Sequence, residues 1–114
     1  LIPIAGWLDL ALVMVGWRTR YRVDGGSMSP ALQHGDTVFV NTRIYRRQAP
    51  HVGDIVVAHH PYQTRIVVKR IGDVHETSVT LLGDNPSEST DSRTLGAFPM
   101  RALIGQVTAR LPGG

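Results

Sequence analysis

From Tyr21 onward, apolar residues alternate with polar ones in short runs. The runs are rich in Val, Ile and Thr, which favour extended backbone. They predict strands over residues 21–23, 37–40, 54–58, 65–71, 78–82 and 103–109. The segments between them, such as HGD, HVGD, HHPY and GDNP, carry the residues typical of turns. This regular spacing of short strands indicates a mainly β domain, an antiparallel barrel or sandwich.

Before Tyr21 the alternation gives way to a nearly continuous apolar stretch. The segment IAGWLDLALVMVGW, residues 4–17, predicts a short helix with Pro3 near its start and Gly16 at its end. It is shorter than the roughly 20 residues that cross a bilayer. Trp7, Trp17 and the arginines that follow suit a helix lying at a membrane interface, and packing against the domain or a partner is the alternative. We therefore expect an apolar helical segment over residues 1–20, a β domain over 21–110 and a tail over 111–114.

Composition narrows the classes of chemistry. A chain of 114 residues forms one domain with a core of its own. With no cysteine, disulfides, thiolate nucleophiles and cysteine metal sites are excluded. The formal charge of +3 is compatible with an anionic membrane surface or a nucleic acid. Because the arginines are scattered along the chain, we expect no nucleic-acid partner and interpret the short clusters RTRYR and RIYRR as solvated faces.

Of the 12 basic residues, Lys69 is the single lysine. Arginine keeps its proton in proteins, whereas a desolvated lysine can act as a base. In the run RIVVKRI, alternation puts Val67, Lys69 and Ile71 on one face. Burial among such neighbours lowers the pKa of a lysine from about 10.4. The alternative is a lysine at a sheet edge whose amine reaches water.

Two polar loops carry hydroxyl groups. In GGSMSP, residues 25–30, glycines and serines surround Met28, which indicates either a surface turn or a nucleophile on a loop that a substrate backbone can approach. The segment GDNPSESTDSR, residues 83–93, is either a plain polar loop or one whose serine holds an amine while Asp91 pairs with Arg93 or Arg70. The dipeptide GD recurs at residues 35–36, 53–54 and 72–73, so by itself it indicates only a turn.

Metal chemistry is not expected, and no cofactor is needed. The histidines all lie in or beside expected turns, at His34, His51, His59, His60 and His75. The segment HETSV begins like a zinc-protease helix but has Val79 in place of the second histidine. A Ser-His-Asp triad is compatible with the spacing, but it would leave Lys69 and the segment STDSR without a role.

Taken together, three segments resemble those of the type I signal peptidases and their relatives. GGSMSPALQHGD resembles the nucleophile segment, VVKRI the lysine segment and GDNPSESTDSR the last segment, in the family's order. The resemblance implies a signal-peptidase-like catalytic core over residues 21–110. It implies Ser27 as the nucleophile, Lys69 as the general base and Ser89 as the serine that orients the lysine.

The same resemblance assigns supporting residues. The residues that brace the last loop by ion pairing are Arg70, Asp91 and Arg93. The loop that faces the substrate contains Gly25, Gly26, Met28 and Pro30. The backbone N–H of Ser27 is one oxyanion donor. Many relatives carry a hydroxyl two residues before the nucleophile as a second donor. Gly25 stands there in this chain, so a backbone or water donor has to replace it.

Among the relatives, the chain most resembles the nickel-type superoxide dismutase maturation proteases. The segments WLDLAL, IYRRQAPHVGDIVVAHHPYQ and LLGDNPSESTDSRTLGA carry this closer resemblance. The stretch between Lys69 and Gly83 is too short for the large extra β-domain of full-length type I signal peptidases.

This resemblance implies a serine endopeptidase that removes an N-terminal leader from a nickel superoxide dismutase precursor in the cytoplasm, with peripheral membrane contact through the N-terminal helix. Because the chain begins with Leu1 rather than Met, the core of a membrane-anchored signal peptidase with an extracytoplasmic catalytic domain remains an alternative. A catalytically silent binding module is the second alternative.

Overall fold

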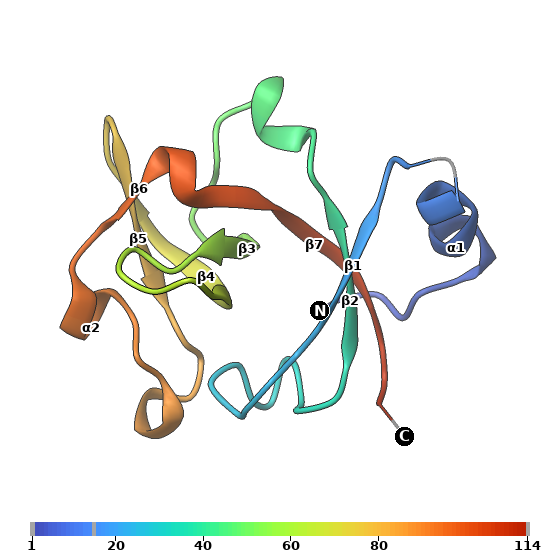
Figure 1. The fold of residues 1–114 in the computed structure, drawn as a ribbon, viewed down its shortest axis with the longest axis horizontal. Coiled ribbons are helices and arrows are strands. Elements are labelled where there is room, and N and C mark those ends of the chain that lie inside the picture. Colours follow the sequence, from blue (N-terminus) through green and yellow to red (C-terminus); the bar gives the residue numbers. More distant parts are fainter. Residues whose placement is uncertain (1, 15, 114) are drawn as a thin grey trace.

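The backbone of residues 2–14 and 16–113, described by a computed structural model, forms one curled antiparallel sheet that resembles an open half-barrel (Figure 1). Its strands are β1 (Thr19–Arg22), β2 (Thr37–Asn41), β3 (Ile55–His59), β4 (Ile66–Val74), β5 (Ser78–Leu82), β6 (Phe98–Pro99) and β7 (Leu103–Leu111). Their order across the sheet is β1-β2-β7-β3-β4-β5-β6, and each neighbouring pair is antiparallel. The mainly β, antiparallel class expected from the alternation is confirmed.

Two α-helices and three short 3-10 turns complete the described part of the chain. They are α1 (Trp7–Met14), α2 (Ser92–Leu95), η1 (Ile44–Arg46), η2 (Pro86–Glu88) and η3 (Met100–Ala102). The expected helix over residues 4–17 is shorter in the structure, and Val15 lies outside the described residues. Gly16 adopts a left-handed φ of 78°, which ends the helix as glycine commonly does. Among the described residues, no helix combines the length and apolar character needed to cross a membrane.

Several strand boundaries differ from the expected ones because pairing with a neighbour extends the ladder. β1 begins at Thr19, which pairs with Val40, and ends at Arg22. β4 continues to Val74, and β7 continues to Leu111. In the expected tail, the N–H of Gly113 also donates to Asp36, at 3.2 Å. β6 and α2 were not predicted, since two extended residues and one helical turn are too short to produce a periodic pattern.

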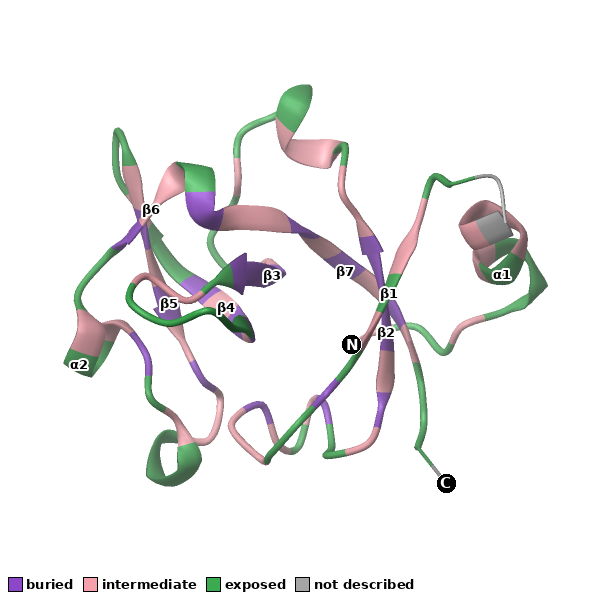
Figure 2. Cartoon of the chain, in the orientation of Figure 1, coloured by how far each residue is buried: buried purple, intermediate pink, exposed green. Residues whose placement is uncertain are grey.

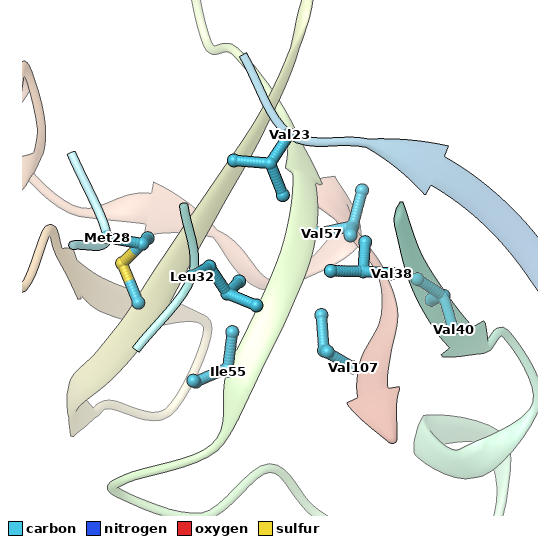
Figure 3. Close-up of a cluster of buried hydrophobic side chains, with 8 residues drawn as sticks. All are labelled: Val23, Met28, Leu32, Val38, Val40, Ile55, Val57 and Val107. Carbon is cyan, nitrogen blue, oxygen red and sulfur yellow. The ribbon is translucent and has the colours of Figure 1, made fainter. Parts of the chain in front are cut away.

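The core consists of two clusters of apolar side chains. The first core cluster contains Val23, Met28, Leu32, Val38, Val40, Ile55, Val57 and Val107 (Figure 3). The second core cluster contains Val56, Ala58, Val67, Ile71, Val79, Leu81 and Phe98. β3 contributes to both, because alternate side chains leave opposite faces of a strand and both faces of β3 are covered (Figure 2). The loop before Leu32 is thereby fixed on one cluster, and β4 is fixed on the other.

Candidate active site

Lys69 is buried in the middle of the sheet. It lies on β4, opposite Val56 of β3, and only 4% of its surface is exposed. Its neighbours on the same face, Val67 and Ile71, are buried as the alternation predicts. β4 lies between β3 and β5, so the alternative of a lysine at a sheet edge is wrong. Burial lowers the pKa of the Lys69 amine, and the opposing attraction of Asp91 is the smaller effect.

The Lys69 amine is held by a serine from the last loop. Lys69 Nζ donates to Ser89 Oγ at 3.0 Å, and Ser89 Oγ donates to Asp91 Oδ2 at 2.7 Å. A hydroxyl has one proton to donate, so Ser89 presents a lone pair to the lysine. An amine that gives one N–H to Ser89 keeps its own lone pair for a different partner. The contact therefore orients the nitrogen as well as holding it.

Asp91 is the centre of the hydrogen bonds in the last loop. Its side chain is 1% exposed and accepts from the backbone N–H of Gly83 at 2.7 Å and of Arg93 at 3.0 Å. The Arg93 guanidinium adds bonds at 3.0 and 2.5 Å. Burial alone would raise the pKa of the Asp91 carboxyl, but the bonds from Arg93, Gly83 and Ser89 together hold it below its usual range. Asp91 is thus ionised and pairs with Arg93, one of the two expected partners.

The other expected partner, Arg70, pairs with Asp84 instead. Its Nε and Nη2 atoms donate to the two carboxylate oxygens of Asp84 at 2.9 and 2.8 Å, and Nη1 donates to the carbonyl of Gly53 at 3.0 Å. Arg70 lies opposite Leu82 in the β4–β5 ladder, so Asp84 follows two residues beyond that pair. Arg70 and Arg93 therefore anchor the last loop by pairing with two different carboxylates, those of Asp84 and Asp91.

Ser27 lies on a loop that is anchored in the core by the side chain of the next residue, Met28. The Met28 side chain is 1% exposed and belongs to the first core cluster, together with Leu32 (Figure 3). The Met28 carbonyl also accepts from the Leu32 N–H at 2.9 Å. Of the residues expected around the substrate, Gly25 and Pro30 are exposed and Gly26 is half-buried. Met28 faces the core, so it fixes the loop, and the loop's role toward a substrate stays a prediction.

Ser27 and Lys69 line the same pocket, with a volume of about 340 Å³. Its lining consists of Tyr21–Asp24, Ser27, Met28 and Arg65–Lys69. Within the described part of the chain, no hydrogen bond joins Ser27 to Lys69. Such contacts are often long in free enzymes and shorten when a substrate binds. A half-buried hydroxyl and a desolvated amine in one pocket can carry out acyl transfer.

A comparison with protein families identifies the family of the chain independently of the geometry. The sequence profile described as "Signal peptidase, peptidase S26" matches residues 1–73 and 71–111. The chain belongs to the signal peptidase family. No curated protein matched the sequence. The family resemblance seen in the sequence is confirmed, and the molecule is a signal-peptidase-like protease.

Sequence reasoning missed two residues of the last loop that support Ser27 in this signal-peptidase-like protease. A Cβ atom on Gly83 would overlap Ser89 Oγ and lie 2.8 Å from the carbonyl oxygen of Ser27. That carbonyl accepts from the N–H of Asn85 at 2.8 Å. The sequence around Gly83 indicates only a turn. The close approach between two segments that are distant in sequence leaves no local pattern. Gly83 lets the loop that carries Ser89 pack directly on the segment that carries Ser27.

Among the described residues, no histidine of this signal-peptidase-like protease lines the pocket that holds Ser27 and Lys69. His34 is the nearest in the loop, and its Nδ1 accepts from the N–H of Gly25 at 2.9 Å. That contact supports the turn at Gly25, whose φ is 82°, rather than the hydroxyl of Ser27. The arrangement favours Lys69 over a histidine as the partner of Ser27.

Proposed function

We propose that this protein is a serine endopeptidase in which Ser27 is the nucleophile and Lys69 the general base. The observation that carries the proposal is the buried Lys69 amine, oriented by Ser89 and sharing a pocket with Ser27. Membership of the signal peptidase family supports the same reaction class. A serine–lysine pair needs no metal ion, so we assign no cofactor to the reaction.

The reaction proceeds in two halves. Ser27 Oγ attacks the carbonyl carbon of the scissile bond, and its proton passes to the neutral Lys69 Nζ. The tetrahedral intermediate collapses, the C–N bond breaks, and the Lys69 ammonium gives the proton to the departing amine. A water then attacks the acyl-enzyme and transfers a proton to Lys69. When the ester bond breaks, that proton returns to Ser27.

Three features of the site lower the barriers of these steps. The lowered pKa of Lys69 increases the fraction of amine that is neutral and able to accept a proton. The bond to Ser89, fixed by Asp91, directs the amine lone pair away from the loop. The N–H of Ser27 stabilises the oxyanion of the intermediate. The second donor, which is a hydroxyl at the position of Gly25 in many relatives, is a backbone N–H or a water here.

We propose further that the substrate is the precursor of a nickel-type superoxide dismutase, processed in the cytoplasm. The support is the resemblance over the three long segments that begin WLDLAL, IYRRQAP and LLGDNPS. There is also a chemical need for such a step. A metal site built on a new N-terminal amine does not exist until the leader has been removed. The nickel belongs to the substrate and not to this protein.

The test is to incubate the purified protein with the precursor and to determine the N-terminus of the product by mass spectrometry. We expect cleavage at one bond by the wild type and none by Ser27→Ala. If the precursor stays intact while a secretory pre-protein in detergent is cut, the endopeptidase stands and the substrate is a signal peptide. If the wild type cuts neither substrate nor a peptide library, the protein is a binding module and the proposal is wrong.

A further inference from the structure

The pocket shared by Ser27 and Lys69 is buried at one end and open at the other. Lys69 is 4% exposed, whereas Ile66, three residues earlier on β4, is 43% exposed, and Arg65 is exposed as well. The turn that joins β3 to β4 is also largely exposed (Figure 2). Arg65 therefore lies at the open end of the pocket, where a substrate longer than the pocket extends beyond it.

Arg65 has a fixed backbone and an unpaired side chain. Its carbonyl accepts from the N–H of His60 at 2.8 Å, which continues the β3–β4 ladder by one pair beyond His59 and Ile66. Among residues 2–14 and 16–113, its guanidinium forms no ion pair with a carboxylate. A guanidinium attached to a fixed backbone and lacking such a partner can bind a carboxylate that another molecule supplies.

The charged side chains that line the pocket are mostly positive. Besides Lys69, the cations are Arg65 and Arg22, and Arg22 also forms no ion pair within the described part of the chain. Asp24 is the single carboxylate among the lining residues, and its side chain is 98% exposed and lies 3.4 Å from His34 Nδ1. Water and salt screen a carboxylate that is so exposed. The pocket therefore has an excess of positive charge even when Lys69 is neutral.

The charge of Arg65 acts inside the pocket. Alternation places Arg65, Val67 and Lys69 on one side of the extended chain, with about 13 Å between the first and last Cα atoms. Burial is the main cause of the lowered pKa of Lys69, and the charge of Arg65 lowers that pKa further. The field of Arg65 therefore reaches the place where the proposed reaction occurs.

We propose that Arg65 is a specificity-determining residue that selects substrates with an acidic side chain near the scissile bond, and that Arg22 adds to the positive field. This inference rests on the proposed function, because the scissile bond is the one that Ser27 attacks beside Lys69. An extended substrate advances about 3.3 Å per residue, as the strand does. The carboxylate that meets Arg65 therefore belongs to a substrate residue about three to five positions from that bond.

The selection should be moderate in size. An exposed ion pair strengthens binding by about fivefold at most, because water competes for both charges. The preference for an acidic residue should therefore be about fivefold at low salt. It should become smaller as the salt concentration rises, since ions screen exposed charges.

Matched peptides test the selection with the purified protein. A quenched fluorescent peptide spanning a bond that the protein cuts is made with Glu, Gln or Lys at each position from three to five residues on either side of the cut. For the wild type, we expect kcat/KM to decrease in the order Glu, Gln, Lys at one of these positions. For Arg65→Glu, the order at that position should reverse. Peptides are compared on the same variant, so any effect of residue 65 on the pKa of Lys69 cancels in the ratio.

Arg101→Glu is the matched control. Arg101 is exposed, forms no ion pair among the described residues and does not line the pocket. The control changes the net charge as much as Arg65→Glu does, and it should keep the wild-type order of the three peptides. Equal kcat/KM for the three peptides at every position in the wild type would overturn the proposal. A reversal by Arg101→Glu as large as that by Arg65→Glu would also overturn it, because total charge would then decide.

Binding separates a failure of this inference from a failure of the proposed reaction. Fluorescence anisotropy measures the labelled peptides on Ser27→Ala and on Ser27→Ala/Arg65→Glu without cleavage, and unchanged thermal unfolding shows that each variant is folded. If the wild type cuts no peptide, tighter binding of the Glu peptide that the second variant reverses still supports the role of Arg65, and the proposed reaction is wrong. If cleavage depends on Ser27 but neither cleavage nor binding shows a charge preference, the reaction stands and the role of Arg65 is excluded.

Discussion

Ser89 Oγ accepts a hydrogen bond of 3.0 Å from Lys69 Nζ while its own proton is donated to the carboxylate of Asp91. The direction of this chain of bonds is set by the charge on Asp91, because a carboxylate accepts hydrogen bonds and does not donate them. Asp91 in turn is held by Arg93 and by the N–H of Gly83. The orientation of the Lys69 amine thus depends on a residue that does not line the pocket.

The first prediction concerns the proposed serine–lysine pair. Ser27→Ala removes the nucleophile, and Lys69→Arg keeps the positive charge but removes the ability to accept a proton. Each should lower kcat/KM for precursor cleavage by about 10⁴-fold or more. Lys69→Met, an apolar side chain of similar length, should fold and be equally inactive. Circular dichroism distinguishes lost chemistry from lost structure, and substantial cleavage by a folded Lys69→Arg protein would exclude the base role of Lys69.

The second prediction is the pH dependence of cleavage. Lys69 is inactive while it is protonated, so kcat/KM should rise with pH through the pKa of the amine. Burial lowers that pKa, and the midpoint should therefore lie below the value of about 10.4 for a free lysine. A profile with a midpoint near about 6.5, lost on replacement of His34 or His75, would support a histidine base instead.

The third prediction separates the positioning role of Asp91 from a merely structural one. The Asp91 charge raises the pKa of Lys69, whereas burial and the charges of Arg65 and Arg93 lower it. Asp91→Asn should therefore move the pH profile of kcat/KM to lower pH, while kcat falls more than KM changes. An effect on stability alone would leave the midpoint of the profile where it is in the wild type.

The companion variant Asp91→Ala leaves the buried N–H of Gly83 and the hydroxyl of Ser89 without an acceptor. It should reduce the free energy of unfolding by about 2 kcal/mol. Denaturant unfolding at neutral pH measures this loss. The asparagine variant retains one acceptor oxygen, so its loss should be smaller than that of the alanine variant.

The fourth prediction concerns the close approach at Gly83. Gly83→Ala introduces a Cβ that overlaps Ser89 Oγ and lies 2.8 Å from the carbonyl oxygen of Ser27. The two loops have to separate, and cleavage should fall by about 100-fold, the cost of a displacement of about 1 Å in a catalytic group. Gly6→Ala is the matched control, because its Cβ has no atom within 4 Å. Equal activity of the two variants would show that the loops tolerate separation.

Alternation along single strands was enough to predict the class of fold and to place Lys69 on an apolar face, but it left open whether the amine was buried or reached water. Val67 and Ile71 lie on the same face of the strand as Lys69, so the lysine side chain is buried with them once that face is covered. Alternation could not predict the partner of Arg70. Asp84 lies beside Arg70 because of the register in which β4 pairs with β5, and a single strand does not reveal that register.

The contacts of Gly83 illustrate the same limit. Glycine is common in turns, and the sequence around residue 83 does not reveal that Ser27 and Ser89 approach it from two sides. The helix α1 was predicted from its apolar residues, but its surroundings were not. Packing against the domain was one of the alternatives, and the side chains of Trp7, Leu8 and Leu10 are exposed.

The position of β7 has a consequence for the order in which the molecule is made. β7 is the last of the strands in sequence, but in the sheet it lies between β2 and β3 and pairs with both. The half that carries Ser27 and the half that carries Lys69 are therefore joined across the sheet only after Leu103–Leu111 has left the ribosome. A nascent chain lacking this strand has both groups of the proposed pair, but the sheet that joins the two halves is incomplete. We therefore expect cleavage activity to depend on the insertion of β7 between β2 and β3.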